Sequence, residues 1–157
     1  VTIIEAGLNF KEEILDLKIN SSNPLISTFS DHWGDGRFKD SKWDKSLKIK
    51  TITLDQLIND HGHPCYIKID VEGYEYNVIK GLTTKTGVIS FEFTSEFFNH
   101  SINCLNYLEN LGYSKFNYSE GERKKFRINW NNKNQVIESI KKEISDDPLF
   151  WGDIYCA

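Results

Sequence analysis

Residues 66–82 read YIKIDVEGYEYNVIKGL and place groups capable of acid–base chemistry inside a strand-like apolar run. Lys68 lies within the run, and the carboxylates Asp70, Glu72 and Glu75 follow it closely. Charged groups beside an apolar core are costly unless they are paired or used. The segment therefore predicts one of two things: an internal ion pair that fixes the edge of a sheet, or a site for a ligand with an ammonium or a reacting hydroxyl.

The spacing of these residues predicts where they lie. On a strand, Tyr66, Lys68 and Asp70 share one face, so Lys68 can approach Glu92 on a neighbouring strand. Asp70 ends its strand, and Glu72 is expected to open the next helix, where the helix dipole favours a carboxylate. Ligands of open α/β sheets bind beyond the carboxyl ends of the strands. We therefore expect Asp70, Glu72 and Glu92 to meet at one rim.

The elements that would position this rim alternate along the chain. β-branched and alternating patterns predict strands over residues 1–6, 15–19, 48–53, 66–70, 88–93, 113–118 and 151–156. Apolar spacing, with a capping Thr53 and glycine stops, predicts helices over residues 53–58, 73–80, 101–111 and 136–144. Short strand–helix–strand spacing in the middle of the chain favours an α/β layer with a parallel sheet.

The composition fits a soluble globular protein of 157 residues with a net charge of −4. That charge gives no positive field for nucleic acid or an acidic membrane, and no apolar run is as long as a membrane span. The three cysteines are far apart and suggest neither a disulfide framework nor a metal finger. We expect a cytoplasmic protein that binds neither nucleic acid nor membrane, and the oligomeric state stays open.

The run IKIDVEGYEYNVIKGL, with TLDQLI before it and ISFEF after it, resembles the FkbM-type family of S-adenosylmethionine-dependent methyltransferases. The resemblance covers roughly residues 1–118, and the final WGDIYCA is similar to the last strand of the family. It implies a Rossmann-like class I methyltransferase sheet in the strand order 3-2-1-4-5-7-6, mostly parallel with an antiparallel last strand. It also implies that S-adenosylmethionine methylates a hydroxyl on a small molecule or glycan.

The resemblance also implies which family strands are present. Residues 1–6 correspond to the third strand, 66–70 to the fourth, 88–93 to the fifth, 113–118 to the sixth and 151–156 to the seventh. The first two strands, which carry the Gly-rich cofactor turn, have no counterpart, and the sequence contains no G-x-G-x-x-G. We therefore expect a partial chain, in which residues 1–157 are the C-terminal two-thirds of a single methyltransferase domain.

The resemblance assigns roles to the acidic residues. Asp70 is expected beside the methyl donor, contacting the amino-acid end of the cofactor or the acceptor hydroxyl. Glu72 and Glu92 are candidates for acceptor binding or for the general base, which must lie within hydrogen-bond reach of the hydroxyl. Lys68 is a candidate for orienting Asp70 or for lowering the pKa of the hydroxyl.

Other candidates carry weaker signals. Glu5 and Ala6 end the presumed third strand, where related folds touch the adenine; an ordinary surface acid is the alternative for Glu5. His32 is a candidate base on a lid, or a solvated loop histidine. Nearby aromatic and basic residues either line an acceptor pocket or order their own loop: Trp33, Arg37 and Phe38.

Two further groups are expected at the surface. His61 and His63 flank a glycine without further metal ligands, so we predict no metal site there. A basic run either meets a phosphorylated acceptor or forms a solvated strand edge, which is the interpretation we favour. Its members are Arg123, Lys124, Lys125 and Arg127.

Two alternatives to the enzyme remain open. One is a non-catalytic binding or interaction domain that kept the fold and lost the cofactor site. The other is a Rossmann-like domain for a different nucleotide. A Gly-rich turn encoded ahead of Val1 favours the enzyme, and its absence from the natural gene favours the binding domain.

Overall fold

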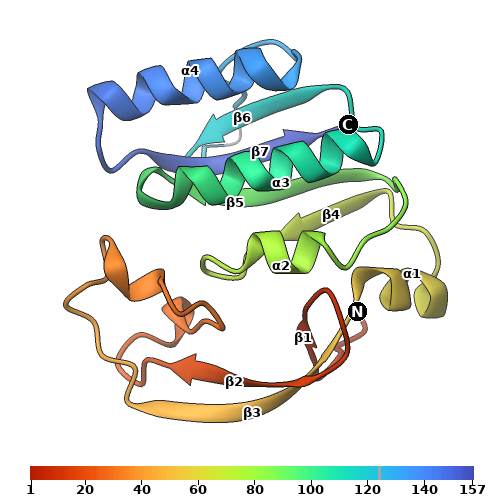
Figure 1. The fold of residues 1–157 in the computed structure, drawn as a ribbon, viewed down its shortest axis with the longest axis vertical. Coiled ribbons are helices and arrows are strands. Elements are labelled where there is room, and N and C mark those ends of the chain that lie inside the picture. Colours follow the sequence, from red (N-terminus) through yellow and green to blue (C-terminus); the bar gives the residue numbers. More distant parts are fainter. Residues whose placement is uncertain (124) are drawn as a thin grey trace. The chain divides into compact units, whose positions relative to one another are not determined.

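The computed structural model describes residues 1–123 and 125–157 (Figure 1). The chain forms two compact units. The first contains Val1–Gly62 and Val71–Thr83, and the second contains His63–Asp70 and Thr84–Ala157. The chain thus leaves the first unit, contributes one strand to the second, and returns before it completes the second.

The first unit is built on a sheet in the order β1-β3-β2. Its strands are β1 (Gly7–Leu8), β2 (Ile14–Ile19) and β3 (Lys45–Ile52), with β1 parallel and β2 antiparallel to β3. A long connection with short 3-10 turns at Pro24–Ile26 and Trp33–Asp35 joins β2 to β3. The helices of this unit are α1 (Leu54–His61) and α2 (Glu75–Ile79).

Local signals set the start of α1, as predicted. The Thr53 side chain accepts a hydrogen bond from the Gln56 amide, which satisfies one of the free N–H groups of the first turn. The Asp55 carboxylate accepts hydrogen bonds from the Thr83 amide and hydroxyl, and this connects α1 to the end of the segment that carries α2.

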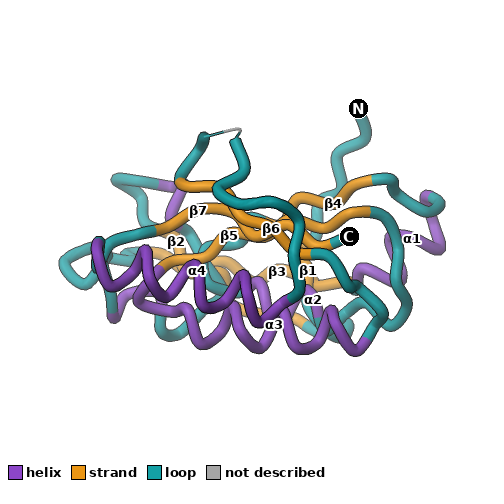
Figure 2. The backbone as a smooth tube through the Cα atoms, turned by 90° about the horizontal axis from the view of Figure 1, so that it is seen from above, coloured by secondary structure: helices purple, strands orange, loops and turns teal. Residues whose placement is uncertain are grey.

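The second unit is a mixed sheet in the order β4-β5-β7-β6. Its strands are β4 (Tyr66–Ile69), β5 (Val88–Thr94), β6 (Phe116–Glu120) and β7 (Trp151–Cys156). β4 and β5 are parallel, whereas β7 is antiparallel to both β5 and β6. Helices α3 (Phe98–Asn110) and α4 (Lys133–Asp146) lie on one face of this sheet (Figure 2).

The alternation of β5 explains this one-sided layer. Ile89, Phe91 and Phe93 are buried, and the Phe93 ring packs against Phe98 of α3. Because successive side chains of a strand point to opposite faces, Ser90 and Glu92 belong to the other face. The helix-covered face is therefore the apolar core of the unit, and the opposite face carries polar groups.

Several predicted boundaries are wrong. Among the described residues the first strand begins only at Gly7, because Val1 and Ile3 are exposed and strand pairing starts opposite Thr51. The strand predicted over 113–118 begins at Phe116, where its pairing with Cys156 of β7 starts. The last strand, β7, is antiparallel as predicted, but the sheet of the second unit is mixed rather than mostly parallel, since β4 and β5 pair in parallel whereas both pairings of β7 are antiparallel.

Candidate functional site

Lys68 is the centre of a charged cluster on the polar face of the second unit. Its Nζ lies 2.5 Å from Asp153 Oδ1 on β7 and 3.5 Å from Asp70 Oδ2 at the end of its own strand. The side chain is 37% exposed, and that of Asp153 is 20% exposed. The internal ion pair predicted for Lys68 is therefore present, but its shortest contact goes to a residue of the last strand.

Strand register explains how Lys68 reaches so far. Lys68 lies beside Ser90 on β5, and Glu92, two residues further on, lies opposite Asp153 on β7. The lysine side chain therefore extends across β5 to the third strand of the sheet. Ser90 leaves room for this path, because it is small, fully buried and held by a hydrogen bond to the Tyr66 hydroxyl.

The electrostatics of the cluster keep Lys68 charged. Burial by itself lowers the pKa of the ammonium, but the hydrogen bond and charge of Asp153, with the charges of Asp70 and Glu92, outweigh burial and raise the pKa. The protonated lysine therefore stabilises the fold at every pH below its ordinary pKa of 10.5. This contribution is lost as the pH rises through the raised value.

Asp70 and Glu92 approach each other at the carboxyl ends of β4 and β5. A carboxylate oxygen of each lies within 4.8 Å of the other, and the Asp70 side chain is 54% exposed. The carboxylates of Asp70, Glu92 and Asp153 all act on the Lys68 ammonium, and Asp70 is the most exposed of the three. Asp70 is therefore the carboxylate of this rim that is most open to a ligand that carries positive charge.

Glu72 does not open a helix, so that prediction is wrong. It adopts a left-handed conformation with φ of 54°, and Gly73 follows with φ of 85°, so the helix α2 begins only at Glu75. The Glu72 carbonyl accepts a hydrogen bond from the Thr28 hydroxyl in the first unit. The convergence of Glu72 with Asp70 and Glu92 stays a prediction.

Glu75 has a structural position in the same turn. Its carboxylate is buried and accepts hydrogen bonds from the amides of Val71 and Gly73. These N–H groups precede α2 and have no partner within a helix, so Glu75 satisfies donors that the turn leaves open. Glu75, one of the carboxylates in residues 66–82, therefore stabilises the turn that precedes α2.

The basis for placing Glu5 and Ala6 at a cofactor-binding strand end is wrong, because both residues precede β1. The residue that follows β1 is Asn9, which is fully buried. Its amide group donates to Glu13 and accepts from the Tyr74 hydroxyl. A contact of Glu5 and Ala6 with adenine remains a prediction that the position of β1 does not support.

The loop candidates lie in the first unit and pack among themselves. Trp33 is 3% exposed, and its ring lies 5.4 Å from that of Phe38, which agrees with aromatic ordering of the loop. The exposed His32 has its Nδ1 atom 3.2 Å from Oδ2 of Asp35. His61 and His63 are both exposed, as predicted.

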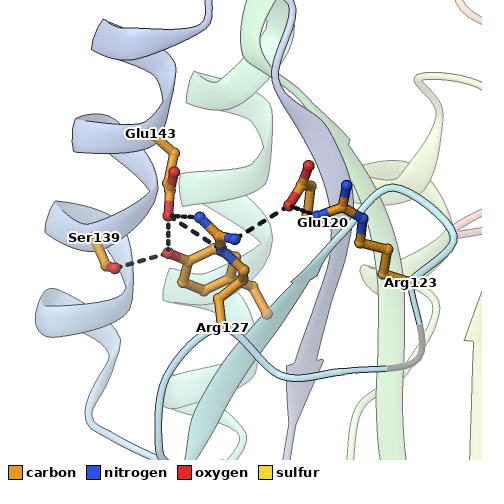
Figure 3. Close-up of polar contacts among 6 residues, drawn as sticks. Glu120, Arg123, Arg127, Ser139 and Glu143 are labelled. Atoms are coloured by element: carbon orange, nitrogen blue, oxygen red, sulfur yellow. Dashed lines mark hydrogen bonds and ion pairs between the residues drawn. The ribbon is translucent and has the colours of Figure 1, made fainter.

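The basic segment after β6 is compensated by acids. Arg127 Nη2 lies 2.7 Å from Glu143 of α4, and Nη1 lies 3.2 Å from Glu120 of β6 (Figure 3). Arg123 also pairs with Glu120, at 2.8 Å. The same Glu143 oxygen accepts a hydrogen bond from the Tyr118 hydroxyl. These pairs favour a structural role for Arg123 and Arg127.

The segment also borders β6 as a strand edge. Isolated bridges pair Ser119 with Phe126 and Phe116 with Asn131. This agrees with the strand-edge interpretation of the basic run. Lys125 is exposed, and Lys124 lies outside the described residues.

We expect Arg127→Met to lower the free energy of unfolding by about 1 kcal/mol, since Arg127 connects α4 to β6 through a network rather than a single exposed pair. Urea unfolding of the full chain measures this. Arg123→Met is the matched control, because Arg123 is 70% exposed and should cost less than about 0.5 kcal/mol. Equal losses in the two variants would contradict the bridging role of Arg127.

Asp153 is the site residue that the sequence interpretation missed. It lies in WGDIYCA, where Gly152, Ile154 and Cys156 are buried and Trp151, Asp153 and Tyr155 alternate with them. An acid at an alternating position of a predicted strand is a signal for the polar face of the sheet. The sequence did not indicate that this acid would contact a residue of β4.

Comparison with known proteins places the chain beside one described family. The sequence model of the family described as "Methyltransferase FkbM domain" matches residues 2–115 of the chain. No curated protein and no solved structure shows a significant match. Within the described residues, every helix is too short or too polar to span a bilayer.

Proposed function

The chain belongs to the FkbM methyltransferase domain family, and from this membership we propose that it is an S-adenosylmethionine-dependent O-methyltransferase. The proposed acceptor is a hydroxyl on a small molecule or glycan. We further propose that the second unit is the half of a Rossmann-like sheet formed by family strands four to seven. Its order β4-β5-β7-β6 supports this, since it agrees with the family order 4-5-7-6.

The exposed Asp70 carboxylate, which lies close to Glu92 on the polar face of the second unit, is the observation that carries the proposal. S-adenosylmethionine has a positive sulfonium and a positive ammonium, and an exposed carboxylate attracts such a ligand. Asp70 directly follows β4 and Glu92 lies near the carboxyl end of β5, the parallel neighbour of β4, which is the edge where ligands of α/β sheets bind. The carboxylates of Asp70 and Glu92 are therefore suitable groups for binding S-adenosylmethionine.

When bound, S-adenosylmethionine would supply an activated methyl group to the acceptor hydroxyl. The chain has to hold the acceptor hydroxyl in line and take up its proton. We propose that Asp70, the most exposed carboxylate of the cluster, contacts the ammonium of the cofactor or the acceptor hydroxyl. Glu92, less exposed and on the neighbouring strand, is the proposed proton acceptor.

Lys68 is proposed to act by charge and not as a base. Its raised pKa keeps the amine protonated at neutral pH, so it has no lone pair with which to accept a proton. A fixed ammonium beside Asp70 and Glu92 limits the repulsion between the two carboxylates.

Calorimetric titration of the full-length protein with S-adenosylmethionine tests the proposal. We expect binding that weakens as salt is raised, because the rim attracts its ligand by charge. Mass spectrometry with a deuterated methyl donor and a panel of sugars and other hydroxyl compounds should then identify a labelled product. If the full-length protein did not bind S-adenosylmethionine, this would contradict the proposed methyltransferase activity and favour a non-catalytic binding domain.

A further inference from the structure

We propose that Asp153 is a positioning residue that holds the Lys68 ammonium across β5, so that the Asp70 carboxylate stays open to the ligand of the site. The inference rests on the proposed function and extends it to the last strand. Asp153 lies outside residues 2–115, which are the residues that the family model matches.

The two contacts of Lys68 differ in a way that supports this role. The ammonium is 2.5 Å from Asp153 but 3.5 Å from Asp70, although Asp70 is the nearer residue along the chain. The longer distance exceeds the usual range of an N–H···O hydrogen bond, about 2.7–3.2 Å. Lys68 therefore places a positive charge beside Asp70 without occupying its lone pairs.

The difference in exposure strengthens the contact with Asp153. The Asp153 side chain is 20% exposed and that of Asp70 is 54% exposed. Water screens an ion pair less when its members are partly buried, so the Lys68–Asp153 pair is the stronger of the two. Without Asp153, the flexible lysine stem is expected to turn toward Asp70, with which it already forms an ion pair.

The sheet fixes this arrangement. The strands β4 and β7 lie on either side of β5, so their backbones are separated by about 9–10 Å, twice the usual strand spacing. The lysine spans that width over Ser90, which is fully buried, while Glu92 lies beside Asp153. A larger side chain at position 90 would obstruct the path of Lys68.

A double-mutant cycle on the full-length protein tests the inference. We expect Asp153→Asn to weaken S-adenosylmethionine binding about tenfold, because Lys68 then closes on Asp70. In the Lys68→Met background the same change should have little further effect, since Asp153 acts through the lysine. Calorimetry measures binding, and thermal unfolding checks that each variant is folded.

A second measurement needs no ligand. Acylation of single lysines, followed by mass spectrometry between pH 8 and pH 10, reports the uncharged fraction of each amine. We expect Lys68 to react several-fold faster in Asp153→Asn than in the wild type. Asp31→Asn is the matched control, because it breaks the Lys18–Asp31 pair in the other unit and should leave Lys68 unchanged.

Two results would overturn the role of Asp153. One is an unchanged reactivity of Lys68 in Asp153→Asn. The other is a loss of binding that is as large in the Lys68→Met background as in the wild type, which indicates a structural effect alone. If the wild type binds no cofactor, the proposed function fails and the ligand part of this inference fails with it. The acylation measurement still decides whether Asp153 holds Lys68.

Discussion

Asp70→Asn is expected to lower the rate of methyl transfer by a factor of at least about 100, which is the usual effect of removing a group that contacts a reacting hydroxyl or its cationic partner. The amide keeps the shape of the side chain but removes the charge at the end of β4. The variant should also bind S-adenosylmethionine more weakly. Single-turnover measurements with the labelled methyl donor give the rate, and calorimetry gives the affinity.

The fold should survive this change. Asp70 is 54% exposed, and its ion pair with Lys68 is long, so we expect the free energy of unfolding to fall by less than about 1 kcal/mol. Asp146→Asn, at the exposed end of α4, is the matched control and should leave both rate and affinity unchanged. Turnover at the wild-type level in Asp70→Asn would remove Asp70 from the proposed site.

Gly73→Ala is expected to lower the free energy of unfolding by about 2–4 kcal/mol, through left-handed backbone strain and overpacking together. Gly73 has φ of 85°, and a Cβ added there would lie 2.4 Å from Cε3 of Trp33. Trp33 is 3% exposed and belongs to the same unit, so its ring has little room to move. Urea or thermal unfolding of the full chain measures the loss.

The variant Gly62→Ala separates the cost of backbone strain from the cost of overpacking against Trp33. Gly62 has a similar φ of 90°, but nothing lies within 4 Å of an added Cβ. This control should show the backbone strain alone, about 1–3 kcal/mol. The contact with Trp33 would be refuted as a cause if Gly73→Ala lost no more stability than Gly62→Ala.

Much of the local structure follows from the sequence because its signals are short-range. The cap at Thr53 starts α1 as predicted, and the last strand occupies Trp151–Cys156 as predicted. A cap needs only residues within one turn, and alternation needs only residues two apart. The family also follows from a contiguous motif, KIDVEG with its neighbours, which the match over residues 2–115 confirms.

Predictions that depended on a partner across the fold were less successful. The β-branched residues 1–6 favour an extended backbone, but a strand also needs a pairing edge, and that edge begins at Gly7. Glu72 was expected to open a helix because the dipole favours an acid there. The left-handed turn at Glu72 and Gly73 prevents this, and Glu75 accepts the hydrogen bonds of the turn instead.

The sequence by itself determined the types of the elements, the family, and the presence of a charged cluster around Lys68 and Asp70. Only the tertiary structure decided that Asp153 is the closest partner of Lys68, because 85 residues separate the two in the chain. The insertion of β7 between β5 and β6, and its antiparallel register, bring them together. Side-chain alternation specifies a face of a strand, but only strand order and register specify which residues meet on that face.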